Sequence, residues 1–575
     1  MKKFKKILAL GLSLAMVLGM GVTSFAVELG NTTPTSSDEQ KADVVISNMS
    51  INEAEFRAVQ IIEPEYVDNK FTGSYKWTAA ATGKSGSVIP TAGSSLSSVA
   101  GLTSEKVQEW AAGATELVTA TAGTGDTVKV NLGVGTWIIV ATPKTDVNVV
   151  YNPMIASVYY TKTDGNDKWT VTPGNLDAAG QWGLETENAY TKSTDLSTET
   201  DKKIGKLNAD GTFTEGQVNG EIGTTNDYQL KGIIPSYGAD YFKEVEVSGS
   251  KVQRTVFYIL QDSQNGRLEY QNDLVVKVGG SVLQSTTTDN TQASPVTKTN
   301  YTVTWYSEEN CGGTVYNAYN AAAKSFKIAF DSSYIEGLAS AADTERKVEV
   351  TYSAKIKAGA VEQVAENTYK LFYTRTPGET EDQVTNRTPI EKKEYTYSAS
   401  INGTVKKVDS ANQSVALSGA TFGLYADAAG TTEITSALTQ ATDANGMVKF
   451  NGLQFGKTYY LKETTAPAGY SLSDKVYSVV CSYTDDNKDN DGKLTSYTVT
   501  IKDESDPTAV AKVINNVSYG GSATVLDAAF PILNTTLASL PSTGGIGTTI
   551  FTIGGCAIMI LAAALYFATR RKSAK

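Results

Sequence analysis

Short runs of alternating polar and apolar residues recur from about residue 46 to residue 537. Examples are VVISNMSI, TVKVNLGVGTWIIVAT, YTVTWY, RKVEVTYSAKIK and SYTVTIKD, all rich in β-branched residues. A period of two is typical of strands that bury one face. Turn sequences such as ADG, DANG and NDGK separate the runs. The pattern predicts an all-β protein of three tandem Ig-like β-sandwich modules followed by a C-terminal transmembrane helix. Within the modules, the best candidate for a helix is SEKVQEWAAGATELVTAT, residues 104–121.

The N-terminus has the order of a secretory signal. Four lysines precede an apolar run that begins at Ile7 and ends at about Val22, and the small residues Ser24 and Ala26 follow. A basic region, a short apolar core and small residues at this spacing are typical of a signal peptide. We therefore expect residues 1–26 to be removed after Ala26 during export.

The C-terminus combines three features in a fixed order. Leu540-Pro541-Ser542-Thr543-Gly544 precedes an uncharged stretch from about Ile546 to Thr569, and the basic residues Arg570, Arg571 and Lys572 follow. The uncharged stretch is long enough to cross a bilayer, and the basic residues hold the tail on the cytoplasmic side. The order resembles the cell-wall sorting signal of sortase substrates, here residues 540–575. The resemblance implies that sortase cleaves between Thr543 and Gly544 and transfers the Thr543 carbonyl to an amine.

Composition narrows the classes of function. The chain has no histidine, three cysteines and a formal net charge of −11. The missing histidine excludes Ser-His-Asp triads and histidine metal sites, and we expect no metal and no cofactor. So few cysteines exclude a disulfide scaffold in an exported chain. The acidic balance argues against a nucleic-acid partner.

Shifts in composition divide the exported part into modules. Two Thr-, Ser- or Glu-rich stretches, AYTKSTDLSTET and TPGETEDQVTNRTPIEKKEY, stand out as joints. We expect a flexible leader over residues 27–45 and three modules over residues 46–185, 198–378 and 395–537.

The third module carries the most specific motifs. It contains GTVKKVDSANQSVALSGATFGLYAD, then ATDANGMVKFNGLQFGKTYYLKETTAPAGYSLS, and ends with FPILNTT. These motifs resemble the SpaA-type pilin domain, also called the Cna protein B-type domain. The resemblance implies an intramolecular isopeptide bond between Lys407 and Asn534, with Glu463 as the catalytic acid. Strand alternation sends one lysine of the Lys406–Lys407 pair outward, so Lys406 stays an alternative.

Such a bond requires unusual ionisation states. A lysine amine is a nucleophile only when neutral, and apolar burial lowers its pKa. A carboxyl group in the same surroundings has a raised pKa, so it can polarise the asparagine carbonyl and transfer protons while ammonia leaves. The reaction occurs once, and its product is structural.

The second module contains ETDKKIGK, NDYQLKGIIPSY, TVFYILQDSQNGRLEYQNDLVV and AENTYKLFYTRTPG. These segments resemble the fimbrial isopeptide-forming domain of Gram-positive major pilins. The resemblance implies a bond between Lys202 and Asn367, with Asp262 as the catalytic carboxyl. Lys203 stays an alternative because the motif leaves the register open by one residue.

The first module contains GVGTWIIVATPK and VYNPMIASVYYTKTDGNDKWTVTPGN. Its order resembles the N-terminal domain of major pilins of the SpaH/EbpB type. Such pilins carry a Y-P-K element whose lysine attacks the sortase acyl-enzyme, but this chain reads Thr172-Pro173-Gly174-Asn175 there. The nearest plausible amine downstream is Lys192, and Lys162 and Lys168 also lie nearby in the sequence.

These features together predict a structural backbone subunit of a sortase-assembled, wall-anchored pilus on a Gram-positive bacterium, and not an enzyme. The expected partners are sortase, copies of the chain, other pilins and the peptidoglycan precursor, and no host ligand can be named. The alternative is a minor pilin or a monomeric wall-anchored adhesin, which would lack an acceptor lysine. A wall-anchored enzyme would need paired catalytic groups in a cleft, and the sequence offers none.

Overall fold

The computed structural model describes residues 24–572 with short gaps. The gaps are residues 39, 90–95, 97–98, 100, 145–146, 165–166, 192, 217, 219, 239–240, 248–249, 290–295, 362, 435–440, 521–528 and 538–546. The signal peptide up to residue 23, the pentapeptide Leu540–Gly544 and Lys192 therefore lie outside the described residues.

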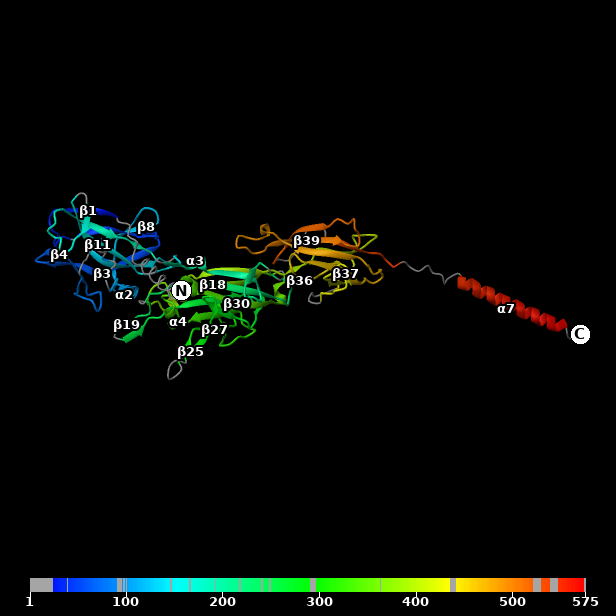
Figure 1. The fold of residues 1–575 in the computed structure, drawn as a ribbon. Coiled ribbons are helices and arrows are strands. Elements are labelled where there is room, and N and C mark those ends of the chain that lie inside the picture. Colours follow the sequence, from blue (N-terminus) through cyan, green and yellow to red (C-terminus); the bar gives the residue numbers. More distant parts are fainter. Residues whose placement is uncertain are drawn as a thin grey trace. The chain divides into compact units, whose positions relative to one another are not determined.

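The all-β prediction is confirmed (Figure 1). The chain divides into two compact units. The first is formed by residues up to 219, 223–359 and 365–396. The second is formed by residues 220–222, 360–364 and those from 397 on.

In the first unit, residues 24–195 build one large and two smaller sheets. The nine-stranded sheet contains β1 (Ser24–Gly30), β3 (Ala54–Val67), β4 (Lys70–Trp77), β5 (Val88–Ile89), β6 (Glu116–Leu117), β9 (Gly135–Pro143), β11 (Met154–Thr163), β12 (Lys168–Thr170) and β13 (Gln181–Glu187). The four-stranded sheet contains β2 (Lys41–Ser47), β7 (Ala120–Ala122), β8 (Thr127–Gly133) and β14 (Ala189–Tyr190), and β10 (Val149–Tyr151) pairs with β15 (Ser193–Asp195). Alternate residues of β2 and β8 are buried in a common core with β9 and β11, as the period of two predicts.

Two local expectations differ from the structure. The leader expected over residues 27–45 contributes β1 and β2, which pair with β13 and β8. The expected helix is confined to α2 (Ser104–Trp110) and a 3-10 turn, η2 (Ala111–Gly113), and strands follow. Gly113 and the β-branched residues after it disfavour a longer helix.

The rest of the first unit holds two further large sheets. The seven-stranded sheet contains β16 (Asp201–Leu207), β17 (Phe213–Glu215), β18 (Thr225–Ile233), β22 (Leu268–Tyr270), β23 (Val275–Val278), β24 (Ser281–Val282) and β30 (Lys347–Ile356). The six-stranded sheet contains β21 (Tyr258–Gln264), β27 (Tyr301–Tyr306), β28 (Val315–Tyr316), β29 (Ser325–Phe330), β31 (Ala365–Tyr373) and β32 (Ile390–Thr396). Two hairpins and short helices complete it: β19 (Glu244–Val247) with β20 (Ser250–Gln253), β25 (Thr286–Asp289) with β26 (Val296–Thr299), α3 (Leu196–Glu199), η4 (Glu309–Cys311), α4 (Ser332–Gly337), α5 (Asp343–Arg346), η5 (Ala358–Ala360) and α6 (Glu381–Thr385).

The two expected joints contain strands and helices among their described residues. β14, β15 and α3 lie in the first joint, and α6 and β32 lie in the second. β32 pairs with β31 along its whole length, so that sheet continues beyond the expected end of the second module at residue 378.

The second unit contains a five-stranded sheet and two strand pairs. The sheet contains β35 (Thr421–Tyr425), β37 (Thr458–Thr465), β38 (Val476–Ser482), β39 (Ser496–Asp503) and β40 (Lys512–Ser518). The pairs are β33 (Ala399–Ser400) with β36 (Asn451–Leu453) and β34 (Val405–Asp409) with β41 (Phe530–Asn534), and η6 (Asp485–Asn487) lies in a loop. The β34–β41 pair is parallel, so a strand near the start of the predicted third module is the direct neighbour of its last described strand.

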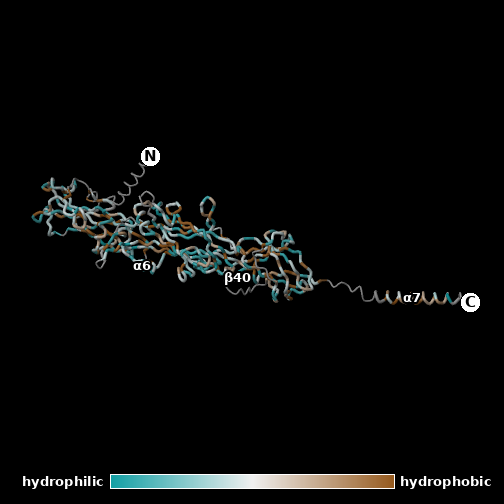
Figure 2. Tube along the Cα trace, turned by 90° about the horizontal axis from the view of Figure 1, so that it is seen from below, coloured by the Kyte–Doolittle hydropathy of each residue, from teal (hydrophilic) through white to brown (hydrophobic). Residues whose placement is uncertain are grey.

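The C-terminal helix is α7 (Gly547–Lys572). Within it, Ile550–Arg570 has a mean hydropathy of 2.2 and is long and apolar enough to cross a membrane (Figure 2). The predicted C-terminal transmembrane helix is therefore confirmed by length and composition.

Candidate cross-linking sites

The first site lies between β34 and β41. Lys407 is fully buried and its Nζ donates to Asn534 Oδ1 at 2.5 Å. Glu463, on β37, lies 3.2 Å from the same Nζ. Asn534 Nδ2 donates to both Glu463 carboxylate oxygens, at 3.0 and 3.1 Å. The structure therefore brings together the three residues that the sequence predicted for the third module.

An aromatic ring and a backbone N–H lie beside this site. The Lys407 ammonium lies 5.8 Å from the centroid of the Phe422 ring, and burial lowers the pKa of Lys407. The Ser473 backbone N–H donates to Glu463 at 2.8 Å and orients the carboxylate. The alternative lysine, Lys406, is partly exposed and sits on the other face of β34, as alternation requires.

The second site lies between the seven-stranded and six-stranded sheets. Lys202 extends from β16, whereas Asp262 and Asn367 extend from the adjacent strands β21 and β31. All three are buried. Lys202 Nζ forms an ion pair with Asp262 and donates to Asn367 Oδ1 at 3.1 Å. The alternative lysine, Lys203, points outward and pairs with Glu215, which is largely exposed.

Burial sets the ionisation of this second site. It lowers the pKa of Lys202 and raises the pKa of Asp262, while the attraction between the two groups opposes both shifts. Both shifts favour a neutral amine beside a neutral carboxyl group. These are the states that nucleophilic attack and general acid catalysis require.

Two tyrosines that the sequence did not single out belong to the second site. The Tyr352 and Tyr270 hydroxyls each donate to Asp262 Oδ1 at 2.8 Å. The Tyr352 hydroxyl also accepts from Lys202 Nζ at 3.1 Å and from Asn367 Nδ2 at 2.8 Å. A signal for Tyr352 does exist: it continues the buried row of β30 that contains Val348, Val350, Ala354 and Ile356, and it alone in that row carries a hydroxyl.

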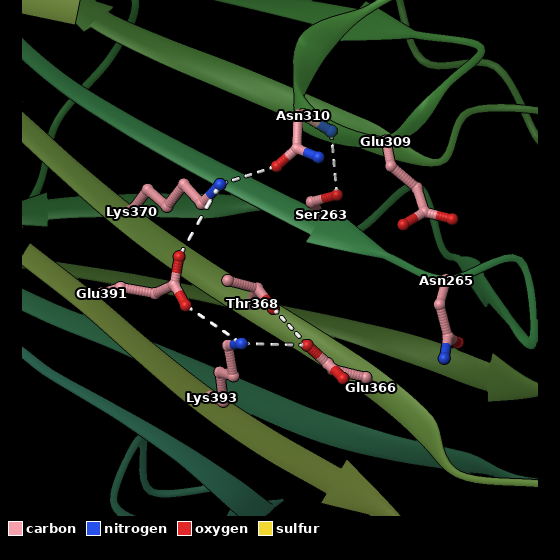
Figure 3. Close-up of a pocket in the computed structure, with 9 residues that line it drawn as sticks. All are labelled: Ser263, Asn265, Glu309, Asn310, Glu366, Thr368, Lys370, Glu391 and Lys393. Atoms are coloured by element: carbon pink, nitrogen blue, oxygen red, sulfur yellow. Dashed lines mark hydrogen bonds and ion pairs between the residues drawn. The ribbon is translucent and has the colours of Figure 1, made fainter. Parts of the chain in front are cut away.

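The opposite face of the same strands carries a polar cavity of about 220 Å³ (Figure 3). Ser263, Glu366 and Thr368 line it because they alternate with the buried Asp262 and Asn367. Its charges pair mainly with one another, in a ladder of Lys370, Glu391, Lys393 and Glu366. The cavity is therefore separate from the buried site.

The first module shows where the lysines near the Thr172–Asn175 turn lie. Lys162 is buried, donates to the carbonyls of Leu176 and Ala178 at 2.7 and 2.8 Å, and lies 4.6 Å from the centroid of the Trp182 ring. Lys168 is exposed on β12 and pairs with Glu185 at 2.8 Å. The structure therefore withdraws Lys162 from solvent and leaves Lys168 accessible.

Comparison with known proteins agrees with this architecture. Residues 402–497 match the SpaA prealbumin-like fold domain, and residues 533–575 match the LPXTG cell wall anchor motif. The trypsin-resistant surface T6 protein of Streptococcus pyogenes serotype M6 is 27% identical over 486 residues, which cover 74% of this chain and 80% of that protein. This chain is an LPXTG-anchored relative of the major pilins. The structure of the T6 backbone pilin, described as modular and three-domain, matches the fold with a TM-score of 0.50 at 19% identity and covers 87% of this chain and 99% of that one.

The anchor motif and the apolar helix α7 make this pilin relative a cell-wall-anchored surface protein of a Gram-positive bacterium. The prediction of an LPXTG-anchored major pilin with a SpaA-type domain is thereby confirmed. The narrower SpaH/EbpB type stays a prediction.

Proposed function

We propose that the chain is the backbone subunit of a sortase-assembled covalent pilus, and that isopeptide bonds join Lys202 to Asn367 and Lys407 to Asn534. The observation that carries the proposal is the pair of buried lysine–acid–asparagine clusters in a chain with a cell wall anchor. A buried ion pair is by itself a weak source of stability. A covalent bond between the same side chains removes both charges and resists force.

The role is structural and not enzymatic. Asp262 and Glu463 each act once, on an asparagine of their own chain, and ammonia is the only small product. Sortase cleaves between Thr543 and Gly544 and joins Thr543 to a lysine of another subunit. The partners of this chain are therefore sortase, copies of the chain, other pilins and, at the base of the pilus, the peptidoglycan precursor.

Lys192 is the proposed acceptor lysine. It lies outside the described residues, immediately after Thr191 and before β15. The buried Lys162 is poorly placed for attack on a bulky acyl-enzyme. Lys168 provides a matched control because it is accessible and lies in the same module.

One observation favours the alternative of a minor pilin or monomeric adhesin. The Y-P-K lysine is replaced by Gly174, where an added Cβ would meet only the Thr172 hydroxyl, at 4.0 Å. Position 174 therefore has room for a side chain that the sequence does not supply. A monomeric adhesin needs no acceptor there.

The polymer is tested in the native organism. Wall proteins released with a muramidase are boiled in SDS and immunoblotted for this chain. We expect a ladder to very high mass that collapses with Lys192→Arg and persists with Lys168→Arg. A single monomer band that becomes a ladder only with Gly174→Lys would establish the monomeric alternative instead.

The internal bonds are tested by intact mass. Each bond releases one ammonia, so the expressed chain 27–543 should weigh about 34 Da less than its sequence. Cross-linked peptides after digestion should pair Lys202 with Asn367 and Lys407 with Asn534. A mass equal to that of the sequence would contradict both proposed bonds.

A further inference from the structure

The two clusters hold the departing nitrogen in different ways. In the third module, Asn534 Nδ2 donates directly to both oxygens of Glu463. In the second module, Asn367 Nδ2 donates to the Tyr352 hydroxyl, and no hydrogen bond joins Asp262 to Asn367 within the described part of the chain. Aspartate is one methylene shorter than glutamate. Its carboxylate therefore stops short of the nitrogen that must leave.

The Tyr352 hydroxyl fills this gap. It lies 2.8 Å from Asp262 Oδ1, 3.1 Å from Lys202 Nζ and 2.8 Å from Asn367 Nδ2, so it contacts all three reacting groups. Its ring is buried and stacks on Tyr228 with centroids 5.3 Å apart and planes 8° apart, which fixes the hydroxyl. Burial raises the pKa of Tyr352, so the hydroxyl stays protonated.

We propose that Tyr352 is a catalytic residue of the second module, which relays a proton from the attacking lysine nitrogen to the departing amide nitrogen. The inference rests on the proposed Lys202–Asn367 bond and names the group that completes its chemistry. It also explains why an aspartate suffices in this module.

The protons balance along this route. Lys202 first gives one ammonium proton to Asp262, and the neutral amine attacks Asn367 Cγ, so that the Nζ–Cγ bond forms and the carbonyl electron pair moves to Oδ1. A second Nζ proton passes to the Tyr352 oxygen while the hydroxyl proton passes to Nδ2. The carbonyl then re-forms, the Cγ–Nδ2 bond breaks and ammonia leaves with three hydrogens. Asp262 ends protonated, Tyr352 is unchanged, and the isopeptide nitrogen keeps one hydrogen.

Tyr270 provides a matched control. Its hydroxyl donates to the same Asp262 oxygen at the same distance, 2.8 Å. Among the hydrogen bonds described for it, none reaches Lys202 or Asn367. Removing either hydroxyl therefore costs Asp262 one donor, but only the loss at Tyr352 interrupts the relay.

The test measures each bond separately. The chain 27–543, held unfolded in urea before reaction, is diluted into buffer, quenched in acid at intervals and digested. The two cross-linked peptides are then counted by mass. Tyr352→Phe should slow the Lys202–Asn367 bond by about 100-fold, the size of a general acid–base contribution. Tyr270→Phe should slow it by less than about 10-fold, and the Lys407–Asn534 bond in the same molecules should form at the wild-type rate in both variants.

Each other outcome is decisive. If the wild type forms no Lys202–Asn367 bond, the proposed function of this module fails. If the wild type and Tyr352→Phe form it equally fast, only the relay is overturned. If Tyr352→Phe disturbs folding, as a lost near-ultraviolet circular dichroism signal would reveal, fluorinated tyrosines at position 352 keep the shape and change the acidity. A rate that does not vary with that acidity would also overturn the relay.

Discussion

The second and third modules each contain a buried lysine, acid and asparagine, but the strands that carry them are arranged differently. In the second, the lysine comes from one sheet and the asparagine and acid come from the facing sheet. In the third, lysine and asparagine lie on neighbouring parallel strands and the acid comes from the five-stranded sheet. The proposed bond would therefore join two sheets in the second module and the strands β34 and β41 in the third.

For the proposed chemistry, the strand order can differ between the two modules, and the reach of the acid is what distinguishes the two sites. Glu463 reaches both the lysine and the departing nitrogen by itself. Asp262 reaches the lysine but needs the Tyr352 hydroxyl to reach the nitrogen. A shorter acid with a tyrosine and a longer acid without one are two solutions to the same distance problem.

The largest effect should come from removing one acid at a time. Glu463→Ala should abolish the Lys407–Asn534 bond and lower that module's free energy of unfolding by about 5 kcal/mol, by analogy with a disulfide that closes a loop of this length. Asp262→Ala should do the same to the second module alone. Mass spectrometry and calorimetric transitions of the chain 27–543 report both effects. A variant that loses both bonds would show that the modules do not react independently.

Shortening the longer acid tests the comparison more finely. Glu463→Asp keeps the charge, but the carboxylate should no longer meet Asn534 Nδ2, and no tyrosine hydroxyl contacts the described residues of this site. We expect the bond to form about 100-fold more slowly. The Lys202–Asn367 bond is the control within the same quenched samples. Formation at the wild-type rate would contradict the argument from acid length.

The pH dependence of stability should distinguish a reacted lysine from an unreacted one. In Asn534→Ala, Lys407 stays a free amine whose pKa burial lowers. Between that lowered pKa and the ordinary lysine value of about 10.4, the unfolded state binds more protons, so the free energy of unfolding rises with pH. Denaturation at a series of pH values measures the slope. The wild type should lack this contribution because an amide does not titrate there.

In the second module, the free energy of unfolding should also fall with rising pH over part of the range. In Asn367→Ala, Lys202 contributes a rise with pH for the same reason. Asp262 has a raised pKa, so the folded state binds more protons above the ordinary aspartate value of about 3.9, and stability falls as pH rises toward the raised value. A fall followed by a rise is therefore expected in this variant. A monotonic curve would show that Asp262 does not titrate as its burial implies.

The sequence predicted the strands and the membership of the two buried lysine–acid–asparagine clusters better than the connections. The period of two was enough to infer an all-β fold and to expect that only one of Lys406 and Lys407 points inward, because alternation is a local property of a strand. The choice of Lys407 came from its place in the motif, directly before Val408 and Asp409. The leader was expected to be flexible and the polar stretches were expected to be joints between modules, yet β2 and β32 are strands because neighbouring strands complete their ladders. Pairing between distant segments cannot be deduced from local composition.

The tyrosines were missed for a related reason. Tyr352 lies 90 positions after Asp262 in the sequence, and several strands come between them along the chain. An inward tyrosine on a strand is consistent with ordinary core packing, and only the fold shows its hydroxyl among three reacting groups. The acid's length was visible in the sequence, but its consequence needs the distance to Asn367.

The smallest effect should come from the neighbouring lysines. Lys203→Met and Lys406→Met remove charges that point outward, one of them paired with the largely exposed Glu215. Pairs of this kind contribute little, so we expect unfolding free energies within about 0.5 kcal/mol of the wild type and both ammonia losses intact. Lys202→Met and Lys407→Met are the matched variants. Each should form only one of the two bonds, so its mass should show the loss of one ammonia and not of two. If Lys203→Met instead lost the second-module bond, the register of β16 would be wrong by one residue, and the network around Tyr352 would have to be rebuilt on the other face of the strand.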